Sequence, residues 1–224
     1  ITPQIIEEIC RGCGLCTKVC PYNAIRINEE KKKAEVIEAA CAGCGTCAAE
    51  CPFGAIVARS FTDEQIIAQI DAATEENAEK KIIAFCCNWC AYAGADFAGI
   101  SRIQYPANVR IIRTMCSGRV SPKFIERAFA RGAAAVLVAG CHPGDCHYIN
   151  ANYHTQRRVE RFWKRMEKLG IRKERLQLLW VSAAEGERLA SKIKEMQAIV
   201  QSVTPEEIEK TKQAFAKGGE KSAS

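Results

Sequence analysis

Two stretches of sequence decide the fold of the first part of the chain: CRGCGLCTKVCPYNAI at residues 10–25 and CAGCGTCAAECPFGAI at residues 41–56. The second repeats the first at an offset of 31 residues, with nine of sixteen positions identical. Each copy reads C-x2-C-x2-C-x3-C-P, so both keep four cysteines and a proline. Such self-similarity indicates an internal duplication.

This spacing is typical of bacterial-type iron–sulfur proteins. Three cysteines at intervals of three can wrap one 4Fe–4S cluster, while the fourth binds the cluster of the other copy. A single C-x2-C would leave zinc as a strong alternative, but two complete copies favour iron–sulfur clusters. We therefore expect one set of ligands from Cys10, Cys13, Cys16 and Cys51, and a second from Cys20, Cys41, Cys44 and Cys47.

The residues around this duplication predict an α+β two-cluster ferredoxin domain over 1–58. Between the two copies, short apolar segments flank a polar run that includes Lys31–Lys33, which predicts a hairpin with a charged tip. Residues 59–80 predict a helix, capped by Thr62 or Asp63, followed by a linker.

Composition limits the class of protein. The chain has 224 residues, of which 14 are cysteine, and 48% are hydrophobic, which excludes a disordered chain. A disulfide scaffold belongs to short secreted domains, and the sequence has neither a secretory signal nor an apolar run long enough to span a membrane. We therefore expect a cytoplasmic protein with reduced, metal-binding thiols. Because the chain begins at Ile1 and not at Met, we also expect a piece of a longer or processed polypeptide.

Residues 81–200 predict an α/β domain with a parallel sheet of about four strands, because short apolar segments alternate with longer amphipathic ones. The expected strands are 81–86, 109–113, 134–139 and 176–181. The expected helices are 91–100, 122–131, 150–169 and 184–200. Residues 201–224 predict a short helix, starting at Thr204 and Pro205, and a disordered end.

Six cysteines follow the first three strands of this domain. Ligands bind at the carboxyl edge of open parallel sheets, so the cysteines predict one site built from three loops. Thiolates favour zinc or iron–sulfur, and dispersed cysteines suit a 2Fe–2S cluster. With Cys86 set aside as buried, we expect four ligands among Cys87, Cys90, Cys116, Cys141 and Cys146, and the sequence leaves open which is spare. Further candidates to contact the cluster, by hydrogen bonds more than by ligation, are His142, His147, Arg119 and Asp145.

Four segments of the second domain together resemble the delta subunit of F420-non-reducing (methyl-viologen-reducing) hydrogenase: CCNWCAYAGAD (86–96), VRIIRTMCSGRV (109–120), VAGCHPGDCHY (138–148) and WVSAAEG (180–186). That resemblance implies an electron carrier with one 2Fe–2S cluster. The first domain is similar to the ferredoxin domain at the carboxyl terminus of the A subunit of heterodisulfide reductase, and the order of the two resembles the fused form.

The resemblance implies a role in methanogenesis-type energy metabolism. The chain would relay electrons from a hydrogenase or formate dehydrogenase to a flavin-based, electron-bifurcating heterodisulfide reductase, as part of a multi-subunit complex with a flavoprotein. The sequence contains no G-x-G-x-x-G, so a flavin is expected only on a missing segment or a partner. We therefore expect an electron-transfer component with no complete active site of its own.

Two other functions compete with the relay. Cys87 and Cys90 form a C-x2-C, which could act as a thiol–disulfide catalytic pair. The net charge of +6 and the Arg- and Lys-rich stretch 157–175 could serve nucleic-acid binding, but interspersed glutamates favour an amphipathic helix with a charged outer face. We therefore expect no nucleic-acid partner.

Overall fold

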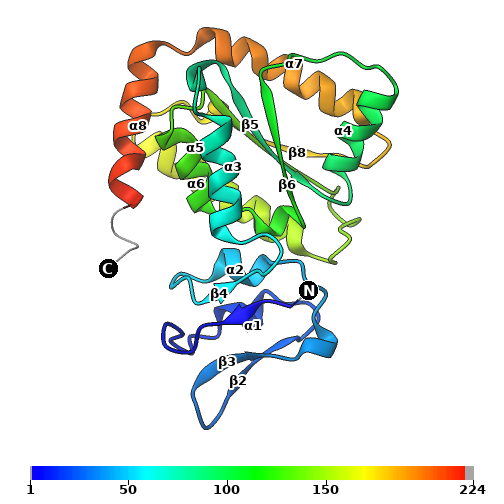
Figure 1. Ribbon diagram of the computed structural model, residues 1–224, viewed down its shortest axis with the longest axis vertical. Coiled ribbons are helices and arrows are strands. Elements are labelled where there is room, and N and C mark those ends of the chain that lie inside the picture. The colour runs from blue at the N-terminus through cyan, green and yellow to red at the C-terminus, as the bar shows by residue number, and fades with distance from the viewer. Residues whose placement is uncertain (1, 220–224) are drawn as a thin grey trace.

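The computed structural model describes residues 2–219 and shows two regions, one below the other in Figure 1. The first, the ferredoxin region (residues 2–58), has two small antiparallel sheets and two short helices. Its strands are β1 (Gln4–Ile5) paired with β4 (Ile56–Val57), and β2 (Ile25–Asn28) paired with β3 (Lys33–Val36). Its helices are α1 (Leu15–Lys18) and α2 (Thr46–Glu50), with a 3-10 turn η1 (Glu38–Ala40) before α2.

The two copies of the duplication adopt the same local structure. Each helix begins after a glycine in the left-handed conformation, Gly14 at φ 74° and Gly45 at φ 77°. Glycine adopts this conformation without the steric cost that a Cβ brings. The expected hairpin is β2–β3, and Lys33 within it turns inward to donate a hydrogen bond to the Cys10 carbonyl at 2.5 Å.

The second, the α/β region (residues 59–219), is built on a four-stranded parallel sheet in the order β6–β5–β7–β8, which confirms the predicted fold. Its strands are β5 (Ile82–Cys87), β6 (Val109–Thr114), β7 (Ala135–Gly140) and β8 (Leu176–Trp180). Alternate residues of β5 face opposite sides: Ile83 and Phe85 enter one core, and Ile82 and Ala84 the other. This period of two is what places apolar residues on both faces of a buried sheet.

Helices cover both faces of this sheet (Figure 1). One face packs against α3 (Asp63–Ala73), α5 (Pro122–Ala130), α6 (Ala151–Lys168) and α8 (Pro205–Gly219). The other packs against α4 (Ala91–Ile100) and α7 (Gly186–Ser202). Short 3-10 turns complete the chain: η2 (Ala78–Lys80), η3 (Ser117–Arg119) and η4 (Lys173–Arg175).

Two helices outside the sequence boundaries 81–200 complete the core of the α/β region. Helix α3, capped by Thr62 in a capping box with Gln65, buries Ile66 and Ile70. Helix α8 buries Phe215, whose ring lies 5.8 Å from that of Phe129. The disorder expected at the end of the chain concerns residues 220–224, which lie outside the described residues. Within residues 2–219, no helix is both long enough and apolar enough to cross a bilayer.

Candidate metal centres

The ferredoxin region holds its eight cysteines in two sets of four. One hollow is lined by Cys10, Cys13, Cys16 and Cys51, together with residues of β2, β3 and β4. A second is lined by Cys20, Cys41, Cys44 and Cys47. The fourth cysteine of each copy therefore lies with the first three of the other copy, which is the interleaved arrangement expected from the sequence. We call these the first set and the second set.

The surroundings of both sets fit iron–sulfur ligation. The amide of Ala34 donates to the Sγ of Cys10, and the amide of Ala24 to the Sγ of Cys20, each at 3.4 Å. Such hydrogen bonds to sulfur stabilise thiolates at clusters and tune them. Burial raises the pKa of the Cys16 thiol to about 11 and also raises that of Cys47. Buried thiols of this kind stay protonated until a metal displaces the proton.

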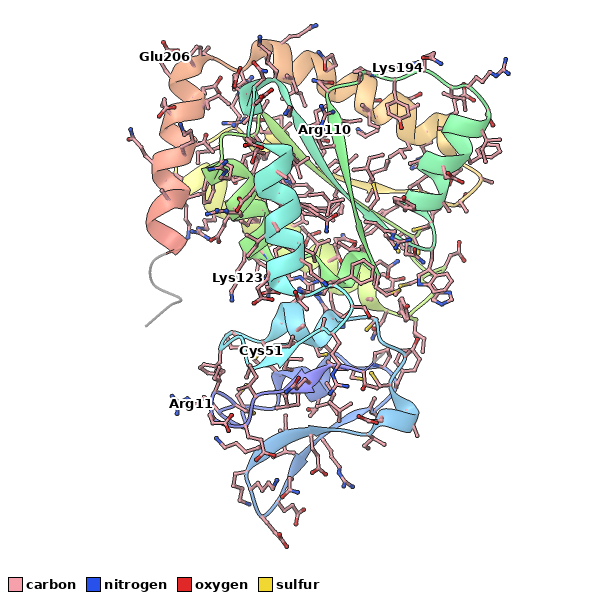
Figure 2. All side chains as sticks on the ribbon, in the orientation of Figure 1. Arg11, Cys51, Arg110, Lys123, Lys194 and Glu206 are labelled. Atoms are coloured by element: carbon pink, nitrogen blue, oxygen red, sulfur yellow. The ribbon has the colours of Figure 1, made fainter. Side chains whose placement is uncertain are left out.

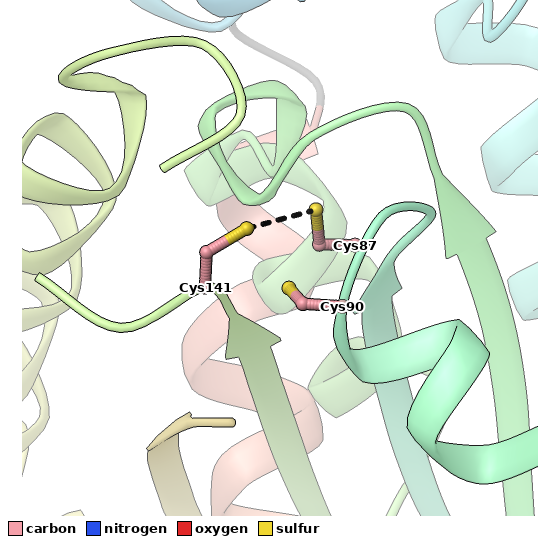
Figure 3. Close-up of side chains that lie close together, drawn as sticks. All are labelled: Cys87, Cys90 and Cys141. Atoms are coloured by element: carbon pink, nitrogen blue, oxygen red, sulfur yellow. Dashed lines mark hydrogen bonds between the residues drawn. The ribbon is translucent and has the colours of Figure 1, made fainter. Parts of the chain in front are cut away.

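A third group of thiols lies at the carboxyl edge of the parallel sheet. Cys87 ends β5, Cys90 follows in the next turn, and Cys141 follows β7. Their Sγ atoms all lie within 4.8 Å of one another, and the Sγ atoms of Cys87 and Cys141 are 4.0 Å apart. Figure 3 shows the three side chains pointing toward one another, Cys87 and Cys90 from the end of β5 and the turn after it, and Cys141 from the end of β7. The side chains are buried, so the group is shielded from water.

Cys116 and Cys146 extend this group to five thiols, which we call the third set. Sulfur contacts with Cys116, Cys141 and Cys90 lower the pKa of Cys87, and contact with Cys146 raises that of Cys116. The amide of Gly118 donates to the Cys116 Sγ at 3.4 Å. All five candidates therefore lie together, and Cys146 is the one that is less than fully buried.

The remaining candidates lie around the third set without joining it. Cys86 is fully buried on the sheet, and burial raises its pKa to about 12. The Nε2 atom of His142 lies 2.6 Å from the Glu185 carboxylate, so this ring nitrogen is hydrogen-bonded to a carboxylate and not to a sulfur. His147 stacks on Trp89, with ring centroids 3.8 Å apart, and Asp145 is exposed.

Sequence reasoning missed residues that hold these loops in place. Asn152 of α6 donates to the carbonyls of Cys141 and His142, at 3.1 and 2.9 Å. Trp89 donates to the Tyr148 hydroxyl at 3.0 Å and so ties the first cysteine loop to the third. Trp89 and Tyr148 are 59 residues apart, and Asn152 and Cys141 are 11 residues apart. The partners of each pair belong to different elements of the fold, so no local pattern in the sequence marks them.

The second and third sets meet where the two regions join. Tyr22 and Cys44 of the ferredoxin region pack against a cluster that contains Cys116 and Tyr148, with Cys146 beside them. Gly118 permits this approach, because a Cβ there would lie 2.3 Å from the Thr46 hydroxyl. The first set lies apart from this junction: its hollow contains no residue of the α/β region. Figure 2 labels Cys51 and Arg11, which both line this hollow, on the left of the ferredoxin region.

A buried ion pair fastens the junction. Arg158 of α6 donates to the Glu50 carboxylate of α2 at 2.7 Å and to the Gly118 carbonyl at 2.5 Å. Burial lowers the pKa of Arg158, and the nearby Glu50 carboxylate opposes that shift. Removing one partner of such a pair leaves a buried charge unpaired, so we expect the loss of either residue to weaken the docking of the two regions.

Fold and cysteine sets together define an iron–sulfur protein, a two-cluster ferredoxin joined to an α/β domain with a thiol site at its sheet edge. Each of the two regions matches a known protein family. Residues 9–55 match the 4Fe-4S dicluster domain, and residues 82–204 match the delta subunit of methyl-viologen-reducing hydrogenase. The latter match covers more than half of the chain, and the chain belongs to that delta-subunit family.

Individual relatives confirm the predicted fusion. The chain is 48% identical, over 90% of its length, to the A subunit of the ferredoxin:CoB-CoM heterodisulfide reductase of Methanosarcina mazei, and it spans a quarter of the length of that protein. It is 58% identical over 113 residues to the iron-sulfur subunit of the F420-non-reducing hydrogenase vhc of Methanococcus voltae, covering 50% of this chain and 78% of that one. It is 43% identical over 135 residues to the F420-non-reducing hydrogenase iron-sulfur subunit of Archaeoglobus profundus, covering 60% of this chain and 98% of that one.

Proposed function

We propose that the chain is an electron relay between a hydrogenase or formate dehydrogenase and a flavin-based, electron-bifurcating heterodisulfide reductase. The observation that carries this proposal is the order of the cysteine sets. The third set contacts the second through Tyr22 and Cys44, and the second shares the duplicated ferredoxin core with the first. Three adjacent metal centres in one chain suit transport of electrons more than chemistry at any one of them.

In this proposal the first and second sets each hold a 4Fe–4S cluster, and four thiols of the third set hold a 2Fe–2S cluster. These clusters supply one-electron transfer when bound. The protein's contribution is to bury the thiols, to donate amide hydrogen bonds to their sulfurs, and to fix the junction with Gly118 and the Arg158–Glu50 pair. Amide donors and burial are also the means by which a protein sets cluster potentials.

Exposed aromatic residues beside the third set support exchange with a partner. Trp89 is 44% exposed and stacks on His147. Ile149 and Tyr153 follow His147 along the chain and are 57% and 44% exposed. Large apolar side chains clustered at a redox site are typical of a surface that docks another protein. We assign this face to the electron donor and the ferredoxin end of the chain to the reductase subunits.

Metal analysis tests the relay. Protein purified or reconstituted without oxygen should contain about ten irons per chain, from two 4Fe–4S and one 2Fe–2S cluster. Electron paramagnetic resonance of the reduced protein should show two cluster types. A content of about eight irons, with zinc or free thiols at the third set, would remove the third centre from the proposal.

Anaerobic purification from the native cells tests the partners. The proposal expects the chain to copurify with a flavoprotein, heterodisulfide reductase subunits and a hydrogenase or formate dehydrogenase. Recovery of the chain without any flavoprotein or dehydrogenase would contradict it.

A thiol–disulfide enzyme is the alternative, and the C-x2-C of Cys87 and Cys90 favours it because their Sγ atoms lie within 4.8 Å of each other. Burial weighs against it: Cys87 is 1% exposed and Cys90 is 4% exposed. Alkylation of the anaerobic protein distinguishes the two functions. Rapid labelling at Cys87 and Cys90 would favour the enzyme, and protection would favour ligation.

A further inference from the structure

The guanidinium of Arg119 is buried where the ferredoxin and α/β regions meet. Its side chain is 1% exposed. Nε donates to the Phe61 carbonyl at 2.9 Å, and Nη2 donates to the Asp63 carboxylate at the start of α3. The Phe124 ring lies against the guanidinium, with its centroid 4.9 Å from Cζ. Three contacts of the Arg119 guanidinium are therefore made within the α/β region.

The remaining nitrogen, Nη1, is buried without a hydrogen-bond partner in residues 2–219. A buried donor of a charged group is costly to leave unpaired, so such a group requires an explanation. Arg119 lines a hollow together with Gly43, Cys44 and Gly45 of the second set. The approach is close, because a Cβ at Gly45 would lie 2.7 Å from the Arg119 Cδ.

The duplication provides an internal comparison. Gly14 is the counterpart of Gly45 in the first copy, 31 residues earlier. A Cβ at Gly14 would find the Thr17 hydroxyl at 3.8 Å as its neighbour, with no cationic side chain of residues 2–219 within 4 Å. Arg11 lines the hollow of the first set but is exposed to water, which screens its charge. The two nearly identical sets therefore differ in their cations. The first has the exposed Arg11 and the partly buried Lys33, which donates to the Cys10 carbonyl, and the second faces the buried guanidinium of Arg119 from the α/β region.

We propose that Arg119 raises the reduction potential of the 4Fe–4S centre held by the second set. The inference rests on the proposed ligation of both sets. Four thiolates outweigh the positive charge of the core, and an added electron makes the centre more negative. A buried cation stabilises that added charge more strongly than an exposed one, because the surrounding dielectric is low. The α/β region would thereby make the junction-side centre a better electron acceptor than it would be without Arg119.

Potentiometric titration of the anaerobic full chain, followed by electron paramagnetic resonance, tests the proposal. In Arg119→Gln, one of the two 4Fe–4S potentials should fall while the other stays. We expect about a tenfold drop in the ratio of reduced to oxidised centre at fixed ambient potential, equivalent to about 59 mV for one electron. Arg119→Lys keeps the charge and should restore most of the potential.

Two matched variants separate charge from structure. Asp63→Asn removes the carboxylate beside Arg119 and should shift the same potential upward. Arg59→Gln removes an exposed cation that lines the same hollow, and should leave both potentials in place. A merely structural role would loosen the junction in both Arg119→Gln and Asp63→Asn, and so would move the potential in the same direction in both.

The proposal is overturned if both potentials are unchanged in Arg119→Gln, or if Arg119→Gln and Asp63→Asn shift the same potential in one direction. Iron content is measured first for every variant. If Arg119→Gln cannot be isolated with full iron, an unchanged or lowered potential in Asp63→Asn overturns the proposal by itself. A wild-type chain lacking two 4Fe–4S centres would instead contradict the proposed function.

Discussion

In the ferredoxin region each set of cysteines comes from two loops of one duplicated motif, whereas the third set is assembled from the ends of three separate strands. The first kind of site is largely local: within each copy the cysteines are separated by two or three intervening residues, and the fourth cysteine of each copy joins the set of the other. The second kind is non-local, because Cys87 and Cys141 are 54 residues apart and meet through the sheet. A local site can be recognised in sequence, and a non-local one depends on a fold that already exists.

The two regions also differ in what fills their cores. The core of the ferredoxin region has eight buried residues, and Cys10, Cys16 and Cys47 are three of them. The α/β region has two larger cores. The one around Phe85 and Phe124 contains no cysteine among its described members, and the one on the other face of the sheet contains four cysteines among many apolar residues. We therefore expect a ferredoxin region this small, with so few apolar residues, to rely on bound metal to fold, because binding free energy is then folding free energy.

Removal of iron should have the largest effect, because it should unfold the ferredoxin region and leave the sheet of the α/β region folded. After anaerobic treatment with a chelator, we expect residues 2–58 to lose their folded structure while β5–β8 keep theirs. Hydrogen exchange measured by mass spectrometry would show full exchange of the ferredoxin amides and continued protection in the sheet. A mock-treated sample is the control. Retained protection over β1–β4 would mean that the apolar core suffices without metal.

Loss of one thiol at the third set should remove a centre while leaving both regions folded. In Cys87→Ala we expect iron to fall by about two per chain, because Cys87 contacts three other sulfurs of the set. Cys86→Ala deletes a sulfur from the adjacent buried position and should leave the iron content unchanged. Metal analysis checks both. Full iron in Cys87→Ala would identify Cys87 as the spare thiol.

Truncation of Phe215 should show that α8 belongs to the core of the α/β region. Its ring stacks on those of Phe129 and Phe162, at 5.8 and 5.5 Å. We expect Phe215→Ala to lower the free energy of unfolding by about 3–5 kcal/mol, measured by urea denaturation of the iron-loaded chain. Phe97→Ala, at a 43% exposed position on α4, should cost less than about 1 kcal/mol. Equal losses would place α8 outside the core.

A smaller effect is expected at the junction itself. Glu50→Gln leaves the buried guanidinium of Arg158 without its carboxylate, and we expect a loss of about 1–3 kcal/mol in the free energy of local opening. Native-state hydrogen exchange of amides in α2 and η3 measures that opening. Glu8→Gln, an exposed position of the same region, is the control. An unchanged exchange rate in Glu50→Gln would show that apolar contacts alone hold the junction.

Sequence reasoning succeeded where the signal is local. All four strands of the sheet begin and end within one or two residues of their expected limits, because each is a short apolar run between polar segments. Capping residues located the helices: Ser121 accepts from the Lys123 amide before Pro122, and Thr62 forms the capping box. The gathering of cysteines at one sheet edge followed from the parallel topology.

The rest could not be read from the sequence because it depends on contacts between distant elements. Arg158 and Glu50 are 108 residues apart, and each alone resembles an ordinary residue on a charged helix face. Phe215 lies in a segment that predicts a short amphipathic helix, and its burial depends on rings that α5 and α6 supply. Tyr22 repeats the position of Phe53, yet Tyr22 packs at the junction while Phe53 is 46% exposed.

The junction where Gly118 approaches Thr46 joins two regions of one polypeptide, and this affects how strong the contact between them has to be. A relative that is matched over 98% of its own length by 60% of this chain is too short to contain both regions. Two separate proteins with these surfaces would have to meet by collision, whereas here the connection through α3 holds the two regions close to each other. Tethering of this kind raises the effective concentration to roughly the millimolar range, so a small contact surface can suffice. The joined chain can therefore tolerate a junction too weak to hold two separate proteins together.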